Sequence, residues 1–555
     1  MAMPRAARWV AVHLPLLSLE AFAATLAWPA TATAAAAAAA AAAGLPGQGA
    51  ARQVGGGGGA GEVSDRADVS RVPAAPLALL ERARITEADD AAQFLGVRPG
   101  MKRATALALA PALALGTADA VRDAQALLAV AHAALRFTPM VCLHGARTVL
   151  LEVSASLRLF GGLPRLLQCL RDEALAPLGH QVRIACAPTA AGAALLALWN
   201  PPLPLLGPHA TRREALRQLL DTAPAELLCD GTQQAQTLQG MGLRTLAEVR
   251  ALPRAGLARR LGPDWLVRLD RARGDAPDPQ DPVRLPDTFE ARLELFTQAD
   301  TGETLSHAAP VLLVRLLAWA RARQGRVARL ELALCHERGR RDGVEAPPHT
   351  VLVLAPAEPT LDEAHLRLLL RERLAVLVLP APVQALWLRC DALAHAAPPS
   401  GDLFPTRAGE REGLVRLLER LQARLGAAQV QRLERLADHR PERATGAAPL
   451  AGLLQAEARG ETVLGLEDLP LARPVWLLAQ PQPLRERGLY PLLDGRPLQL
   501  LAGPQRIESG WWDGEPVARD YFIAQAEDGA LVWICRARLP LSQPGAGWFL
   551  HGRFA

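Results

Sequence analysis

The acidic residues in the N-terminal part of the chain decide which chemistry this protein could carry out. Glu20 and Glu152 each stand beside an apolar run. Asp89 or Asp90 could supply a third acid, whereas no aspartate occurs in residues 1–61. Carboxylate oxygens are the ligands that Mg²⁺ prefers in proteins. The chemistry that these acids could support is therefore the binding of a divalent metal ion.

Two apolar runs must position these acids. The run from Arg8 to Leu14 predicts a buried strand, and Ser18 to Phe22 predicts the start of a helix after Pro15. Val149 to Val153 predicts the second arm of a strand hairpin. Strands and helices go on alternating up to Asn200, which is typical of an α+β domain.

Composition and periodicity divide the rest of the chain. An Ala- and Gly-rich block at about residues 30–72 has no apolar periodicity with which to build a core, so we expect a flexible insertion. Later segments are first helical in pattern, then mixed, then β-rich. We therefore expect a multidomain α+β protein with parts at residues 1–205, 206–283 (helical), 284–395 (α+β), 396–445 (a linker with an amphipathic helix) and 446–555 (β-rich).

Charge and cysteine usage limit the partners and the compartment. The net charge of +5 permits a polyanionic partner. Lys102 is the only lysine, so nearly every cation is arginine; this suits phosphate contacts, but a GC-rich coding bias gives the same composition. The seven cysteines are scattered singly without metal-ligand spacing, which favours a reducing compartment and no cofactor.

The N-terminus has some features of a signal peptide, because it is apolar and leads into small residues. His13 and Glu20 interrupt the apolar run, however, and no strongly apolar span of membrane-crossing length occurs elsewhere. We expect a cytoplasmic protein without a membrane segment, and export remains an alternative.

Three segments resemble the Y-family translesion DNA polymerases, and their order along the chain resembles the ImuB branch of that family. Residues 11–20 correspond to the strand where the family has two aspartates and a glutamate, and here Ala11 and His13 replace the aspartates. Residues 145–153 correspond to the second catalytic strand, where Arg147 and Thr148 replace an Asp-Glu pair. The third, residues 96–101, resembles the turn of the fingers domain.

These replacements have a direct chemical consequence. Alanine offers no ligand, neutral histidine is a poor ligand for Mg²⁺, and the cation of Arg147 opposes a metal ion at the same place. The resemblance therefore implies a degenerate polymerase palm and fingers without catalysis, metal or cofactor. The alternative is an active Y-family polymerase with rearranged ligands drawn from Glu20, Glu152 and Asp89 or Asp90.

Two further domains are implied to contact DNA without reading its sequence. Residues 238–249 resemble a helix-hairpin-helix of a Y-family thumb, whose glycines let backbone amides approach a phosphate. Residues 289–295 resemble the first strand of the family's little finger. The implied DNA contacts are Gly240, Gly242, Arg244, Arg254, Arg259, Arg292, Arg326 and Arg329. A solvated basic surface is the alternative for each arginine.

The linker and the tail carry the implied protein contacts. Asp402, Leu403 and Phe404 look like the peptide by which polymerases dock on the sliding clamp, although Ser400 replaces the usual glutamine. A latch on the protein's own domain is the alternative. Residues 440–444, 507–514, 519–522 and 548–552 resemble the tail of ImuB-like proteins, which implies contacts with partner proteins at Trp511, Trp512, Tyr521 and Trp548. A small β core would use the same aromatics.

By this resemblance the partners are DNA, the sliding clamp, an ImuA-like RecA-related protein and an error-prone DnaE-type polymerase. The protein would then be an adaptor in DNA damage repair and induced mutagenesis.

Overall fold

The computed structural model describes residues 7–26, 76–200, 209–337, 340–341, 344–345, 347–395, 407–449, 473–538 and 547–554. The chain forms two compact units, Met1–Ser400 and Gly401–Ala555. The whole of the Ala- and Gly-rich block and the whole of the predicted clamp peptide, Asp402 to Phe404, lie outside the described residues.

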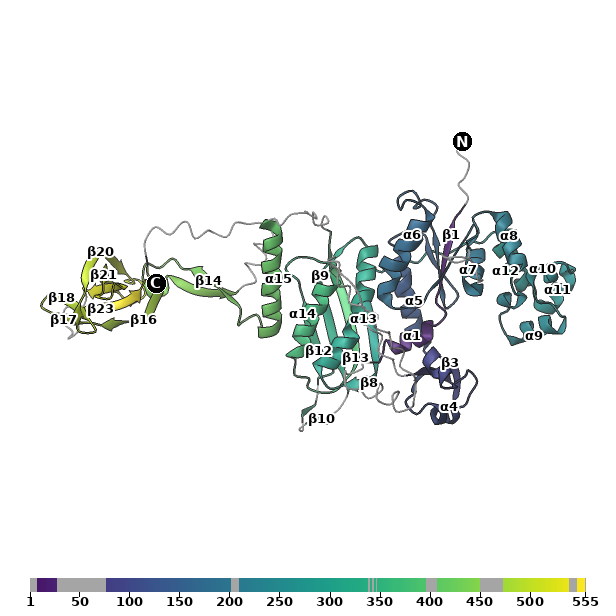
Figure 1. The fold of residues 1–555 in the computed structure, drawn as a ribbon, viewed down its shortest axis with the longest axis horizontal. Coiled ribbons are helices and arrows are strands. Elements are labelled where there is room, and N and C mark those ends of the chain that lie inside the picture. Colours follow the sequence, from purple (N-terminus) through teal and green to yellow (C-terminus); the bar gives the residue numbers. More distant parts are fainter. Residues whose placement is uncertain are drawn as a thin grey trace, which may run out of the picture. The chain divides into compact units, whose positions relative to one another are not determined.

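A four-stranded antiparallel sheet carries the first two segments of the resemblance (Figure 1). Its strands, in sheet order, are β5 (Val141–His144), β6 (Thr148–Glu152), β1 (Trp9–His13) and β7 (Arg183–Ala187). Buried strand residues such as Val10 and Leu151 pack against helices in a single core, as the apolar runs predict. The helices of this part are α1 (Leu17–Ala23), α5 (Ala120–Ala134), α6 (Leu163–Cys169, continued by a π turn Leu170–Leu175 and a 3₁₀ turn Ala176–Leu178) and α7 (Ala190–Trp199).

A smaller three-stranded sheet follows residue 75. It consists of β3 (Arg84–Ala88), β2 (Leu77–Glu81) and β4 (Ala114–Thr117), with the short helices α3 (Asp90–Phe94) and α4 (Arg103–Leu109). Gly96 and Gly100 both have φ of +90° in the turn between the helices, a conformation that favours glycine. The turn predicted for residues 96–101 is confirmed.

Residues 211–274 form the predicted helical module. Its elements are α8 (Arg213–Asp221), a 3₁₀ turn (Ala225–Leu228), α9 (Thr232–Gly240), α10 (Leu246–Arg250), α11 (Arg254–Leu261) and α12 (Pro263–Arg273). Trp265 is fully buried in the core that the module shares with α7.

A second four-stranded sheet completes the first unit, in the order β12-β9-β13-β8. Its elements are β8 (Phe289–Ala299), α13 (Gly302–Ala322), β9 (Arg326–His336), the ribbon β10 (Arg340–Arg341) and β11 (Val344–Glu345), β12 (His349–Leu354), α14 (Glu363–Ala375) and β13 (Val383–Ala394). The backbone N–H of Phe296 donates to the carbonyl of Thr25 at 3.1 Å, so β8 also bonds to the segment after α1. None of the described helices, the 21-residue α13 included, is long and apolar enough to cross a membrane.

The second unit is β-rich, as predicted. It contains α15 (Arg407–Leu425), which lies within the predicted linker of residues 396–445. The hairpin β14 (Gln431–Arg435) and β15 (Thr445–Pro449) follows, with the 3₁₀ turn Pro441–Arg443 between its arms. A five-stranded sheet follows the order β16-β23-β22-β21-β20, beside a three-stranded sheet β17-β18-β19. Their bounds are β16 (Trp476–Pro483), β17 (Arg485–Arg487), β18 (Tyr490–Leu493), β19 (Arg496–Pro497), β20 (Gln499–Ser509), β21 (Val517–Gln525), β22 (Leu531–Ala537) and β23 (Trp548–Arg553).

The helical module gives a test of its packing. Leu269 of α12 is 2% exposed, whereas Val267 on the same helix is 40% exposed. We expect Leu269→Ala to lower the free energy of unfolding of this module by about 3 kcal/mol, because a buried leucine leaves a cavity. Val267→Ala should change it by less than about 0.5 kcal/mol. Urea unfolding followed by far-UV circular dichroism measures both, and equal effects would contradict the packing of α12.

Candidate functional site

The positions that the resemblance assigns to the metal ligands lie together where β1 ends beside β6. His13 stands opposite Thr148 in the antiparallel register, and Ala11 stands opposite Leu150. His13 Nδ1 lies 2.9 Å from Thr148 Oγ1 inside the protein, so each side chain satisfies the other. Ala11 is fully buried. Ala11, His13 and Thr148 are thus packed, uncharged side chains on two paired strands, at positions where the resemblance places carboxylates.

Arg147 supplies the charge at this strand end. Its guanidinium donates to the carbonyl of Pro15 at 3.0 Å, to Ser18 Oγ at 3.2 Å, and to the carboxylate of Glu87. Ser18 Oγ in turn donates to the Asp123 carboxylate at 2.5 Å. Arg147 thereby connects the four-stranded sheet to β3 of the smaller sheet, and its cation stands next to α1.

The electrostatic environment keeps His13 neutral. Burial lowers its pKa to about 4, and the cations of Arg183 and Arg147 act in the same direction. The cations at this strand end are Arg147 and Arg183, and the Glu87 carboxylate, which could attract a divalent ion, is already paired with Arg147.

A cavity of about 410 Å³ opens beside this strand end. Its walls include His13, Arg147 and leucines of α7 and of the 3₁₀ turn, and the acids that line it are Asp230 and Asp278. Asp278 accepts from the N–H of Ala191 at 2.9 Å. Asp230 forms an ion pair with Arg268. Both carboxylates are thus engaged by protein donors.

The acids of the alternative ligand set lie apart. Glu20 accepts from the N–H of Gln181 at 3.0 Å, and Asp89 caps α3 by accepting from the N–H of Ala92 at 2.7 Å. Glu152 accepts from the N–H of Arg8 at 3.2 Å, at the opposite end of β6 from Thr148, about 13 Å along the strand. Within the described ranges, no three His, Cys, Asp or Glu side chains are grouped closely enough to hold a metal ion.

The predicted hairpin occupies the segment between α9 and α10. Gly240 is the last residue of α9, and Gly242 has φ of +71° with open space around it, so the glycine turn is present. The backbone amides of residues 241–246 all donate within the protein, however. Those of Arg244 and Thr245 donate to the carboxylate of Glu248, and these bonds lower the pKa of Glu248.

The expected mechanism of phosphate binding is therefore wrong for these six amides, because a carboxylate and carbonyls already hold them. The sequence carried a signal for this. Thr245 and Glu248 form a capping box, the pattern of a threonine followed three residues later by a glutamate. At this turn, a phosphate would therefore be contacted by arginine side chains and not by these amides.

The arginines of the helical module differ in how free they are. Arg254 forms a bidentate pair with Asp270 at 3.0 and 2.5 Å, which raises its pKa. Arg244 and Arg259 are exposed, and neither forms an ion pair with a side chain in the described part of the chain. Arg259 is thus the predicted module arginine whose charge is most open to a phosphate, because the charge of Arg244 already acts on the carboxylate of Glu248.

The predicted arginines of the second sheet are distributed over β8 and β9. Arg292 pairs with Glu294 at 3.2 Å and Arg329 pairs with Glu331 at 2.5 Å, and both pairs are exposed to solvent to a large extent. Arg326 begins β9 and is half-buried. The acids neutralise much of the positive charge on this sheet, so a phosphate would have to compete with them.

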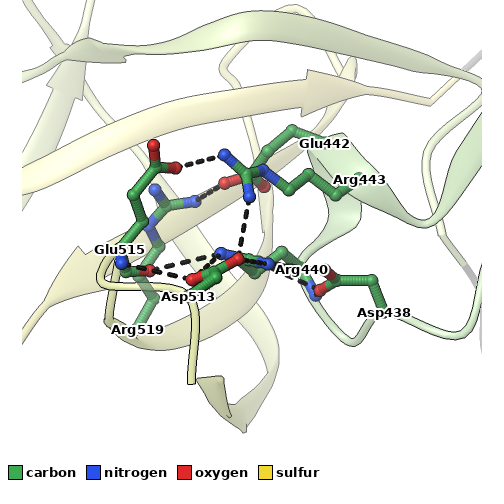
Figure 2. A network of polar contacts seen from close by, with 7 residues as sticks. All are labelled: Asp438, Arg440, Glu442, Arg443, Asp513, Glu515 and Arg519. Carbon is green, nitrogen blue, oxygen red and sulfur yellow. Dashed lines mark hydrogen bonds and ion pairs between the residues drawn. The ribbon is translucent and has the colours of Figure 1, made fainter. Parts of the chain in front are cut away.

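The tail holds a second polar cluster, drawn in Figure 2. Arg440, 2% exposed, donates to Asp438 at 2.7 Å and to Asp513 at 2.5 Å. Arg443 donates to the same Asp513 at 2.9 Å and to Glu515. The hydrogen bonds from Arg440 lower the pKa of Asp438 to about 2. The loop of the β14–β15 hairpin is thereby bonded to the turn between β20 and β21.

That turn presents two tryptophans. Trp511 and Trp512 are 79% and 54% exposed and meet edge to face with centroids 5.3 Å apart. The Arg440 guanidinium lies 5.9 Å from the ring centre of Trp512. Gly510 has φ of +84°, and a Cβ there would lie 2.7 Å from Arg440 Nη1, so the turn needs glycine at this position.

The other two predicted tail residues lie inside the β domain. Tyr521 is 1% exposed, stacks on Trp533 with centroids 4.0 Å apart, and its hydroxyl lies 2.8 Å from His551 Nδ1. Trp548 is 5% exposed in the neighbouring core. The surface contacts predicted for Tyr521 and Trp548 are therefore unavailable in this fold, because a small domain needs these large side chains for its interior.

Comparison with known proteins identifies the family. Two curated proteins named Protein ImuB, from two strains of Caulobacter vibrioides, are each 30% identical to this chain over 479 residues, which is 83% of this chain and 100% of the relative. The chain belongs to the ImuB family. No family model matches it.

Solved structures similar to this ImuB family chain include a ternary complex of Dbh, with a TM-score of 0.35 and 14% identity over 69% of this chain and 98% of that one. DinB from Sulfolobus solfataricus gives 0.34 and 14% over 70% and 99%. A Y-family DNA polymerase chimera built on Dbh gives 0.35 and 15% over 70% and 99%. The family assignment rests on the ImuB relatives.

The neutral state of His13 predicts a pH dependence for this ImuB family chain. Because its pKa is about 4 in the fold and about 6.5 when unfolded, the unfolded chain binds more protons between these values, and stability falls as the pH falls through that window. We expect His13 to account for about 2 kcal/mol of the stability lost between pH 7.5 and pH 5.

The variant His13→Asn keeps a polar partner for Thr148 and does not titrate, so its loss over this range should be smaller by that amount. Urea unfolding at the two pH values measures the difference. His132→Asn should reduce the loss by a similar amount, because burial also lowers the pKa of His132 to about 4. Identical pH profiles for wild type and His13→Asn would contradict the assignment.

Proposed function

We propose that this ImuB family member is a non-catalytic adaptor in mutagenic translesion synthesis during the DNA damage response. It would link DNA, the sliding clamp, an ImuA-like RecA-related protein and an error-prone DnaE-type polymerase. The observation that carries the proposal is the guanidinium of Arg147, held by Pro15, Ser18 and Glu87 where the resemblance places a metal-binding carboxylate.

Electrostatics supports the absence of catalysis in this proposal. A divalent ion at about 4 Å from a guanidinium is repelled by on the order of 8 kcal/mol at an effective dielectric constant of about 20. The Glu87 carboxylate offsets part of this repulsion, but it is already paired with Arg147. Two metal ions would require several uncommitted carboxylates at this strand end.

An adaptor needs no active site. A protein that binds the clamp and a polymerase at once raises the local concentration of that polymerase at a stalled primer end. In this proposal Arg244, Arg259, Arg292, Arg326 and Arg329 contribute phosphate contacts, Asp402 to Phe404 dock on the clamp, and the exposed pair Trp511 and Trp512 contacts partner proteins. The clamp assignment and the partner assignment carry separate tests.

The competing function, an active polymerase with rearranged ligands, has less support. Glu152 lies at the far end of β6, and Glu20 and Asp89 each accept from a backbone amide elsewhere. Bringing these acids to one ion would require breaking those bonds and moving a strand that is paired along its length.

Primer extension and clamp binding together test the adaptor. We expect the purified full chain to extend no primer with Mg²⁺ or Mn²⁺ on an undamaged template, because the metal positions hold Ala11, His13, Arg147 and Thr148. It should retain the clamp in a pull-down, and the double change Leu403→Ala with Phe404→Ala should abolish that retention. The matched control is Leu414→Ala with Leu417→Ala, which changes two exposed leucines of α15. Robust extension by the wild type would sink the proposal.

The exposed aromatic pair gives a separate prediction. Truncation of a hot-spot tryptophan at an interface costs about 2 kcal/mol or more. We therefore expect Trp511→Ala with Trp512→Ala to weaken binding of the ImuA-like protein or of the DnaE-type polymerase by roughly thirtyfold in calorimetric titration. Trp476→Ala removes a tryptophan that is 72% exposed on β16 and should leave both affinities unchanged. Equal effects of the two variants would argue against this turn as the docking site.

A further inference from the structure

Arg315 on α13 is a buried cation without a counter-ion. It is 6% exposed, and within the described residues its guanidinium has no hydrogen bond, ion pair or aromatic partner. The other two buried arginines differ. Arg273 lies 2.5 Å from Asp221, and Arg440 lies 2.5 Å from Asp513.

Such an arrangement costs free energy unless an anion compensates it. Burying a guanidinium removes its hydration, and arginine remains charged at any physiological pH. Burial lowers the pKa of Arg315, and no carboxylate acts against this effect. A buried, unpaired guanidinium that faces a cavity is therefore a candidate anchor for an anionic ligand.

The cavity beside Arg315 has the size of a small-molecule site, about 550 Å³. It lies where β8 and α13 of the second sheet meet α1, β4 and the start of α5, all within the first unit. Two more arginines, Arg122 and Arg292, line it together with Arg315. The lining acids are Asp119 and Glu294, so the formal charge of the lining side chains is positive.

The acids in the cavity are engaged by other groups. Asp119 caps α5 by accepting from the N–H of Val121 at 2.9 Å and of Arg122 at 3.1 Å. Glu294 pairs with Arg292 at 3.2 Å on the exposed side. Neither carboxylate is bonded to Arg315, whose charge therefore remains open to a ligand.

The same cavity has an aromatic wall. Phe296 is 51% exposed and packs edge to face on the buried Phe22 with centroids 5.3 Å apart. Gly116 lies behind Phe22, where a Cβ would come within 2.6 Å of the ring, so glycine lets the wall come this close. Proteins that bind single-stranded nucleic acids stack bases on exposed aromatic rings and hold phosphates with cations. Phe296 and Arg315 supply one group of each kind to the same cavity.

We propose that this cavity binds one nucleotide unit, with its phosphate on Arg315, assisted by Arg122, and its base against Phe296. The phosphate comes either from a single strand of DNA or from a free nucleotide. The assignment to a strand rests on the proposed DNA association, whereas the phosphate site itself does not.

The test uses the full-length protein, thymidine monophosphate by calorimetry, and a fluorescent oligothymidylate by anisotropy. Arg315→Gln should weaken binding of the monophosphate by about tenfold or more, because a charge-assisted contact is lost. The matched control is Arg367→Gln on α14 of the same domain, an exposed arginine paired with Glu363 at 3.5 Å. It should leave the affinity within about twofold.

Phe296→Ala keeps the test informative if Arg315→Gln folds poorly, because Phe296 is half-exposed and only its backbone bonds to Thr25. Weaker binding of both probes in both variants supports a strand as the source, and weaker binding of the monophosphate alone supports a free nucleotide. Unchanged binding of both probes in both variants overturns the cavity proposal and leaves DNA association standing. Monophosphate binding that Arg315→Gln abolishes, with no oligonucleotide binding by the wild type, supports the cavity and counts against DNA association.

Discussion

The hydrogen bonds of the Arg147 guanidinium are the constraint that joins the two sheets at the candidate site. The guanidinium reaches a carbonyl before α1, a hydroxyl on α1 and a carboxylate on β3, so a single side chain fixes the helix and joins two sheets. A metal ion held by carboxylates could join the same helix and sheets by accepting ligands from each. Arginine does so with a permanent charge and fixed donor directions, and it needs no ion to complete the fold.

The neutral histidine next to it follows from the same constraint. A protonated His13 would stand with Arg147 and Arg183 at a buried strand end, and burial together with those cations holds its pKa far below the usual value. The ring therefore serves as a hydrogen-bond partner of Thr148 in the strand register. This ImuB family chain therefore has a neutral ring and arginine cations at the strand end where the resemblance places carboxylates.

Local sequence patterns predicted helices and strands well, because hydrophobic periodicity and helix capping depend on residues that are close together in the sequence. The strand predicted at Arg8 to Leu14 is β1, and the helix start predicted at Ser18 to Phe22 lies within α1. The pairs Arg147–Glu87 and Arg440–Asp513 join residues far apart in sequence, and no local pattern encodes them.

A chain with a single lysine assigns one side-chain type to opposite tasks, and the carboxylates nearby decide which task applies. Arg440 has two carboxylates and is fully committed to ordering the turn that exposes Trp511 and Trp512. Arg147 has one carboxylate and acts as a strut between sheets. Arg315 has no carboxylate partner among the described residues, although it is buried like Arg440. The amino-acid composition does not distinguish these three arginines, because a coding bias explains it equally well. Their partners in the fold do distinguish them. Among the described residues, Arg315 is the buried arginine that has no carboxylate to balance its charge.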